Sequence, residues 1–279
     1  MKNLIIVFLL ISVALSAQTH RFIYEYKFKS DSLAKDFRKE NMVLDVNPDE
    51  VKFYPYVYAE NDSLNKVRDF KNIMWDDAVP ALKRKSGSNT NISYFLLTDF
   101  FSLKTEDKIL WTLTNETKKS GDYLLQKATA GFGGRKWIAW FSKDVAVAEG
   151  PYKFRGLPGL IFEINDDRNN FIFNLIKSQK FNNTYDTSEF LEKFAGKKPI
   201  EISENFLNKK KLEMFNDPLR DFKEQFKNSS GSGTFMVMGT QVKSAEQFKE
   251  LSENFQEMLR KENNPIEIDK ALKYPLKKK

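Results

Sequence analysis

The chain has no cysteine and one histidine, His20, among its 279 residues. The absence of cysteine excludes disulfide bonds, thiolate metal sites and cysteine nucleophiles. A histidine-based triad could use only His20. Long apolar runs are also missing after the N-terminus, because no later segment approaches the roughly 18 uninterrupted apolar residues that suggest a membrane-spanning helix. The mean hydropathy of -0.53 argues against a polytopic membrane protein.

The N-terminus has the pattern of a secretory signal peptide. Lys2 is followed by an apolar run from Leu4 to Ala17, and the polar residues from Gln18 onward end it sharply. The run is shorter than the roughly 20 residues that span a bilayer. We therefore expect residues 1–17 to be cleaved off after Ala17 and the mature chain to be exported, either to the periplasm or to the outer membrane and cell surface. Since no cysteine follows the run, a lipoprotein anchor is excluded.

The remaining composition is that of a folded, moderately basic protein. Hydrophobic residues make up 41% and aromatic residues 14% of the chain, which supports a substantial core and argues against intrinsic disorder. The formal net charge is +7. Because the lysines are scattered and export is expected, we interpret this charge as solvated surface and predict no nucleic-acid partner.

The order of strand and helix patterns predicts an α+β fold. Residues 21–28 alternate with period two, and six further strands with short links are predicted between about 92 and 178, as in an antiparallel β-meander. The spacing from about 186 to 263 is helical. We therefore expect residues 18–279 to form one domain, in which an open or half-barrel sheet is packed by C-terminal helices.

Two earlier segments carry more specific expectations. Apolar residues recur at helical spacing in residues 63–85, which predicts a helix there. Pro55 lies inside the predicted strand 51–58 and cannot donate to a β-ladder, so this strand is expected at a sheet edge or bulge.

The strongest motif lies in residues 133–165, where two turn signals follow a strand rich in aromatic residues. The segment Leu157–Leu160 fits a type II turn, with Pro158 fixing φ at the second position and Gly159 supplying a positive φ at the third. We interpret the turn and its flanking aliphatic residues as a structural device that fixes sheet register. The residues assigned to this structural motif are Gly150, Pro151, Gly156, Leu157, Pro158, Gly159, Leu160 and Ile161.

The hexapeptide at 156–161 resembles the signature of the GLPGLI family, exported proteins of the Bacteroidetes group. Segments 134–135, 139–141, 150–154 and 264–267 are similar to further positions of that family. Many members carry a cysteine near position 125, where this chain has leucine, so no role for such a thiol transfers to it. The resemblance implies export and proximity to genes for outer-membrane (TonB-type) transport, but no established reaction.

Basic and aromatic residues of the motif block are the candidate ligand-binding residues. Arg135, Lys153 and Arg155 lie near turns and could form an anion pocket, since arginine presents a bidentate fork to carboxylate or phosphate. The alternative is surface charge, or pairing with nearby acids such as Asp166. The aromatic candidates, which could stack on a sugar or a peptide or could simply be core, are Trp137, Trp140 and Tyr152.

Metal and catalytic sites have weaker support in the sequence. The adjacent carboxylates at 166–167 could bind Ca²⁺, and the thioethers of Met236 and Met238 could bind Cu(I), but both patterns are common without a metal. We predict no metal and no cofactor. Glu149 and Glu163 are available as a carboxylate pair, although nothing in their spacing selects them, and a Ser–Lys pair is also open.

Three functional hypotheses follow. The first is a non-enzymatic exported envelope protein that binds a ligand or a partner and is accessory to outer-membrane transport; it predicts an open apolar pocket lined by Trp137 or Trp140. The second is a secreted carboxylate-dependent hydrolase of glycan or peptide, which requires two acids about 5 to 10 Å apart in one cleft. The third is a structural envelope protein, which predicts no cleft.

Overall fold

The computed structural model describes residues 18–68, 72–76, 80–228 and 234–276. The predicted signal peptide, residues 1–17, lies outside these ranges. Within them, none of the helices is long and apolar enough to cross a membrane.

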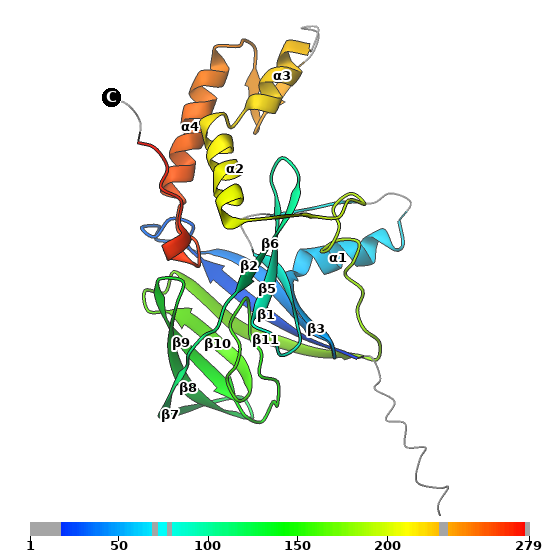
Figure 1. Cartoon of the computed structure of the whole chain (residues 1–279), viewed down its shortest axis with the longest axis vertical. Helices are drawn as coiled ribbons and strands as arrows, with labels where there is room; N and C mark the ends of the chain where they lie inside the picture. Colours follow the sequence, from blue (N-terminus) through cyan, green and yellow to red (C-terminus); the bar gives the residue numbers. More distant parts are fainter. Residues whose placement is uncertain (1–17, 69–71, 77–79, 229–233, 277–279) are drawn as a thin grey trace, which may run out of the picture.

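Twelve strands form one large sheet that dominates the molecule (Figure 1). They lie side by side in the order β12-β6-β5-β4-β3-β2-β1-β11-β10-β9-β8-β7. The strands are β1 (Thr19–Phe28), β2 (Arg38–Val46), β3 (Glu50–Pro55), β4 (Ala81–Lys85), β5 (Thr90–Leu96), β6 (Phe100–Glu106), β7 (Thr112–Ser120), β8 (Tyr123–Phe132), β9 (Arg135–Ser142), β10 (Leu160–Asp166), β11 (Phe171–Phe181) and β12 (Ile200–Ile202).

The α+β class with an open sheet is confirmed, but a single antiparallel meander is not an exact description. The sheet consists of two meanders, β1 to β6 and β7 to β11, which are joined where β1 pairs with β11 along its whole length, from Thr19 opposite Phe181 to Phe28 opposite Phe171. The pair β12–β6 is parallel, so the sheet is mixed. The first strand of this sheet begins at Thr19, so the N-terminal strands belong to the same sheet as those between about 92 and 178.

Two local predictions are wrong for physical reasons. Strand β3 lies inside the sheet, between β2 and β4, and not at an edge. Pro55 is its last residue, opposite Met42 of β2 and beyond Phe53, where the pairing with β4 ends. The missing N–H of Pro55 therefore costs no hydrogen bond of the ladder. The segment 63–85 is not one helix. Helix α1 spans Tyr56–Asn65 and β4 follows at Ala81, while Leu64 is 40% exposed and does not line a buried face.

The C-terminal helices stand above one end of the sheet, with α2 and α4 side by side (Figure 1). Ser203 caps α2 by accepting a hydrogen bond from the backbone N–H of Phe206 at 3.2 Å, as expected for its position before the helix. The Phe206 ring contacts Phe101 of β6. The elements after β12 are α2 (Glu204–Asn216), α3 (Arg220–Asn228), β13 (Phe235–Val237), β14 (Thr240–Val242), α4 (Gln247–Lys261) and the 3-10 helix η1 (Ile268–Lys270).

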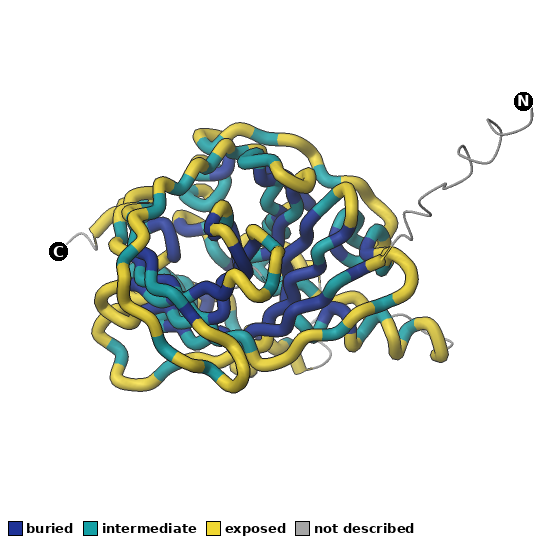
Figure 2. The backbone as a smooth tube through the Cα atoms, turned by 90° about the horizontal axis from the view of Figure 1, so that it is seen from below, coloured by how far each residue is buried: buried dark blue, intermediate teal, exposed yellow. Residues whose placement is uncertain are grey.

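The helical part has a small apolar cluster of its own, so its helices do not all pack on the sheet as predicted. This cluster joins α3, α4 and the β13–β14 hairpin, and its buried members are Leu219, Val237, Val242 and Phe248. The core of the sheet is a different cluster from this helical one. In Figure 2 the buried segments run through the interior of the molecule, and exposed loops surround them.

The Gly-Leu-Pro-Gly bend belongs to the sheet core. Leu157 and Leu160 are 1% and 0% exposed, so the leucines of the bend pack in the core, whereas Pro158 between them is exposed. The predicted type II turn is not formed, because Gly159 has φ +152° instead of the roughly +80° of that turn. Its N–H closes a tighter turn onto the Leu157 carbonyl oxygen at 2.8 Å, and the Leu160 N–H donates to the Val145 carbonyl oxygen at 3.1 Å. The Val145 carbonyl oxygen, in the loop before the bend, thus accepts the hydrogen bond that the Leu160 N–H would donate to Leu157 in a type II turn.

Candidate functional site

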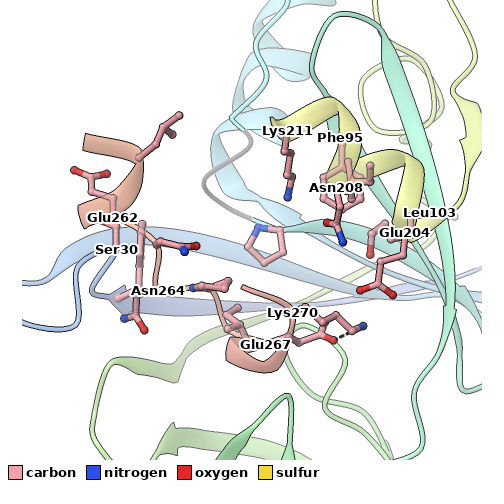
Figure 3. A pocket seen from close by; sticks show the side chains of 18 of the residues that line it. Ser30, Phe95, Leu103, Glu204, Asn208, Lys211, Glu262, Asn264, Glu267 and Lys270 are labelled. Carbon is pink, nitrogen blue, oxygen red and sulfur yellow. Dashed lines mark ion pairs between the residues drawn. The ribbon is translucent and has the colours of Figure 1, made fainter. Parts of the chain in front are cut away.

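A groove of about 510 Å³ lies between the sheet, α2, α4 and the chain that follows α4 (Figure 3). One wall is the sheet, where β5 and β6 contribute Phe95 and Leu103. The opposite wall is helical, where α2 contributes Leu207 and α4 contributes Phe255. The groove is in the size range of small-ligand sites, so it is the candidate functional site among the described residues.

The segment 263–270, which we call the C-terminal strap, forms the floor of the groove and lies directly on the motif block. A Cβ on Gly133 would lie 2.8 Å from Glu267 Cα, and one on Gly134 would lie 2.9 Å from Ile268 Cγ2. Both glycines also have positive φ, at +62° and +73°. Their missing side chains therefore allow the strap to approach the β8–β9 turn closely.

Arg135 holds this strap through its guanidinium group. Its Nε donates to the Ile266 carbonyl oxygen at 3.0 Å, and its Nη2 donates to Asn264 Oδ1 at 2.6 Å and to the Pro265 carbonyl oxygen at 2.8 Å. Its Nη1 contacts Asp166 Oδ2 at 3.3 Å. Since all three guanidinium nitrogens have partners within the chain, Arg135 binds the strap rather than an external anion.

Lys153 forms the charged base of the groove. Its Nζ lies 2.7 Å from Glu267 Oε1, 3.0 Å from Asp107 Oδ2 and 3.2 Å from Thr105 Oγ1. The side chain of Lys153 is only 3% exposed. The Tyr152 hydroxyl donates to the same Glu267 carboxylate. One lysine thus joins β6, the motif block and the strap.

The electrostatics of this cluster keep both acids ionised at neutral pH. Burial by itself would raise the pKa of Glu267, but the charge and hydrogen bond of Lys153, with a further bond from Lys270, leave that pKa below its ordinary value. The pKa of Asp107 is lowered in the same way, because Lys153 outweighs its burial. Burial, followed by the adjacent Glu267 charge, raises the pKa of the Tyr152 hydroxyl, which therefore remains a donor.

The anion pocket predicted from Arg135, Lys153 and Arg155 is not formed. Arg155 Nε lies 3.2 Å from Glu149 Oε1, and the same carboxylate is bound by the fully buried Arg84 at 2.5 Å. Each of the three cations is therefore neutralised by a buried acid, which is the pairing that the sequence left open as an alternative. Arg135 and Arg155 do not line the groove, whereas Lys153 does.

The aromatic candidates are divided between the core and the groove. Trp137 is 0% exposed and its indole N–H donates to the Phe132 carbonyl oxygen, so it cannot stack on a ligand. Trp140 is half-buried, with Lys118 Nζ 4.4 Å from its ring centroid, and it does not line the groove. Neither tryptophan lines the groove, so the groove is not the predicted pocket lined by tryptophan. Only Tyr152 of the three is a groove residue.

The remaining candidates do not assemble into a site. Glu163 forms an ion pair with Lys118, and Glu149 forms ion pairs with two arginines. Neither glutamate lines the groove. Asp166 is buried and accepts a hydrogen bond from the Phe171 N–H. Met236 and Met238 are exposed in and beside β13. No group of three or more acidic or histidine side chains that could hold a metal ion occurs in the described ranges.

Sequence reasoning missed most of the groove residues. Glu204, Asn208 and Lys211 lie on one side of α2, and Figure 3 shows their side chains reaching into the groove. They are four and three positions apart, which is the spacing of residues on one face of a helix. This spacing is the feature of the sequence that could have identified them as a group. Glu267 falls in a segment that is similar to a family ending, but nothing local linked it to Lys153.

One family model matches the motif block. A model described as "Protein of unknown function (Porph_ging)" matches residues 134–163, from the β8–β9 turn to β10. This is the broad type of family that the motif predicted, a Bacteroidetes-associated family of unknown function. The model does not carry the name of the family that the hexapeptide resembles.

Two solved structures share part of the fold. Both bear the name PNGF-II, one in space group C2 and one in P21, and each is 16% identical to this chain with a TM-score of 0.52. They cover 70% and 69% of this chain but only 32% and 33% of their own. At this identity the likeness concerns the fold alone, and the chain spans about a third of the length of these structures. No curated protein matches the chain significantly.

Proposed function

We propose that this protein is an exported, non-enzymatic envelope protein of the GLPGLI type that binds a ligand in the groove between the sheet and the C-terminal helices. The groove itself carries the proposal. It has apolar walls on both sides and a base in which Lys153 is already satisfied by Glu267 and Asp107. Such a site offers apolar burial with a few fixed polar groups, which is the usual composition of a ligand site.

The charge state of the base favours binding over hydrolysis. A glycosidase needs one carboxylic acid that stays protonated at the working pH, with a raised pKa. The pKa values of Glu267 and Asp107 are instead lowered, by Lys153 against the effect of burial. Both groups act as acceptors for the lysine, and neither is poised to donate a proton to a leaving group.

The export route and the transport context come from the sequence. The apolar N-terminal run supports export through a cleaved signal peptide to the periplasm or the cell surface. The hexapeptide at 156–161 supports an accessory role beside an outer-membrane transport component, which would receive or supply the bound ligand.

Filling the groove tests this proposal. Asn208 lines the groove from α2 and is half-buried, whereas its neighbour Lys209 is exposed and does not line it. We expect Asn208→Trp to lower the amount of small molecule that co-purifies with the protein from its native envelope at least about tenfold, because the indole occupies the ligand volume. Native mass spectrometry of the full chain measures the bound fraction.

Lys209→Trp is the matched control, since it adds the same indole one position away on the solvent side of α2. It should retain the ligand at the wild-type level, and both variants should keep the wild-type thermal midpoint. Equal retention in wild type and Asn208→Trp would exclude the groove as the binding site. If the wild type retains no ligand and cleaves a glycan or a peptide, the proposed binding function is wrong and the protein is a hydrolase.

A further inference from the structure

The groove has an ordered row of polar side chains along α2. Glu204, Asn208 and Lys211 line it, and Figure 3 shows all three reaching from the helix toward the space above the strap. Seven positions separate Glu204 from Lys211, which at 1.5 Å per residue corresponds to about 10 Å along the helix axis. An anion, an amide and a cation therefore follow one another along one wall.

The lysine of this row is placed at the sheet side of the groove. Lys211 Nζ lies 5.3 Å from the centroid of the Phe95 ring. An ammonium group has three donors, so it can donate to a ligand carboxylate in addition to its contacts within the chain. Glu204, at the other end of the row, is half-buried in the first turn of α2. Its carboxylate is suited to an ammonium group on the ligand.

We propose that the groove binds a short peptide with free termini in extended conformation, its amino group at Glu204 and its carboxylate at Lys211. This inference rests on the proposed function, because it names the ligand class of the same groove. Extended chain rises about 3.4 Å per residue, so a row of about 10 Å matches roughly three residues.

The middle of the row fits the middle of such a ligand. The Asn208 amide has two donors and an acceptor oxygen, and can therefore pair with both groups of a peptide bond. Apolar side chains of the peptide would lie on Leu207 and Phe255 on one side and on Phe95 and Leu103 on the other. A fatty acid would use the apolar walls and Lys211 but would make no use of the Glu204 carboxylate, which would keep only the charge interaction with Lys270 within the chain.

Binding of the tripeptide Leu-Ala-Leu to the full chain, measured by isothermal titration calorimetry, tests the proposal. We expect N-acetylation of this peptide and C-terminal amidation each to weaken binding about tenfold, because each removes one charge-assisted hydrogen bond. Glu204→Gln should abolish the difference between the free and acetylated peptides. Lys211→Met should abolish the difference between the free and amidated peptides.

Lys209→Met and Glu213→Gln change the same charges on exposed positions of α2 that do not line the groove. They should leave all three peptide affinities unchanged. If acetylation and amidation have no effect, or if their effects survive in Glu204→Gln and Lys211→Met, the assignment is wrong. Tighter binding of decanoate than of the free peptide, unaffected by Glu204→Gln, would identify an anionic amphiphile instead.

The two proposals fail separately. If Asn208→Trp abolishes retention of the native ligand but no form of Leu-Ala-Leu binds to the wild type, the groove remains the binding site and the peptide class is rejected. If the peptide binds equally to wild type and Asn208→Trp, both the groove assignment and the peptide orientation are rejected.

Discussion

Gly159→Ala is expected to destabilise the protein by about 4 kcal/mol, an effect confined to a few structural mechanisms. A Cβ at this position would lie 2.0 Å from the Ser142 carbonyl oxygen and 2.6 Å from its carbonyl carbon. Both are backbone atoms at the end of β9, so no side chain can rotate away. The φ of Gly159 is +152°, which adds strain for any residue with a Cβ. The β9 end or the bend would have to move.

Two other glycines separate the causes of this effect. Gly131 has an ordinary φ, and a Cβ added there would meet nothing within 4 Å, so Gly131→Ala should stay within about 0.5 kcal/mol of wild type. Gly156 has φ +92° but equally open surroundings, so Gly156→Ala should show the strain alone, roughly 1–2 kcal/mol.

Urea unfolding of the three variants, monitored by tryptophan fluorescence, measures these differences in the free energy of unfolding. The expected order is Gly159→Ala, then Gly156→Ala, then Gly131→Ala, from most to least destabilised. A Gly159→Ala variant as stable as Gly131→Ala would show that the bend does not press on the end of β9. The glycine of the motif would then need another explanation.

The elements that sequence reasoning predicted well are those with strong local signals. The strand rich in aromatic residues that was expected in the motif block is found as β9, and its alternating side chains point into a core on one face. The bend at 157–160 was interpreted as a structural element, and its two leucines are buried in the core. Both depend on neighbours a few residues away, which a single sequence records directly.

The pairing of distant segments could not be read from local patterns. Tyr152 and Glu267 are 115 positions apart, and Arg135 and Asn264 are 129 positions apart. Nothing in the sequence around Glu267 indicates that its partner is a lysine in a distant segment, Lys153. The same limit applies to Lys153, because its acids are contributed by the loop after β6 and by the strap. The partners of Arg135 and Arg155, Asp166 and Glu149, lie next to and within the motif block and could be considered from the sequence.

Lys153→Met is expected to cost about 3–5 kcal/mol at pH 7, the range for breaking a buried ion pair by removing one partner. The side chains of Asp107 and Glu267 are 8% and 9% exposed and both contact the Lys153 ammonium. Methionine preserves most of the side-chain volume but leaves two buried carboxylates close together without their shared cation. The strap would lose its main ionic contact with the motif block, so this variant also tests the attachment of the groove floor.

The pH dependence distinguishes charge from packing. In the wild type the lowered pKa values of Asp107 and Glu267 contribute stability above their unfolded values of about 4, and this stability is lost as the pH falls through the folded values. In Lys153→Met both folded pKa values should rise, because the charge that lowers each of them most is removed. The variant is therefore penalised at neutral pH, and the difference from wild type should narrow as the pH falls from 7 toward 4.

Lys270→Met is the matched control, because Lys270 binds the other oxygen of Glu267 at 2.7 Å but is 36% exposed. Solvent screens such a pair, so its loss should cost less than about 1 kcal/mol. Urea unfolding of wild type and both variants at pH 7 and pH 4 provides the comparison. If the gap between wild type and Lys153→Met is the same at both pH values, the lysine supports the groove floor through packing of its aliphatic stem, and the two carboxylates do not depend on its charge.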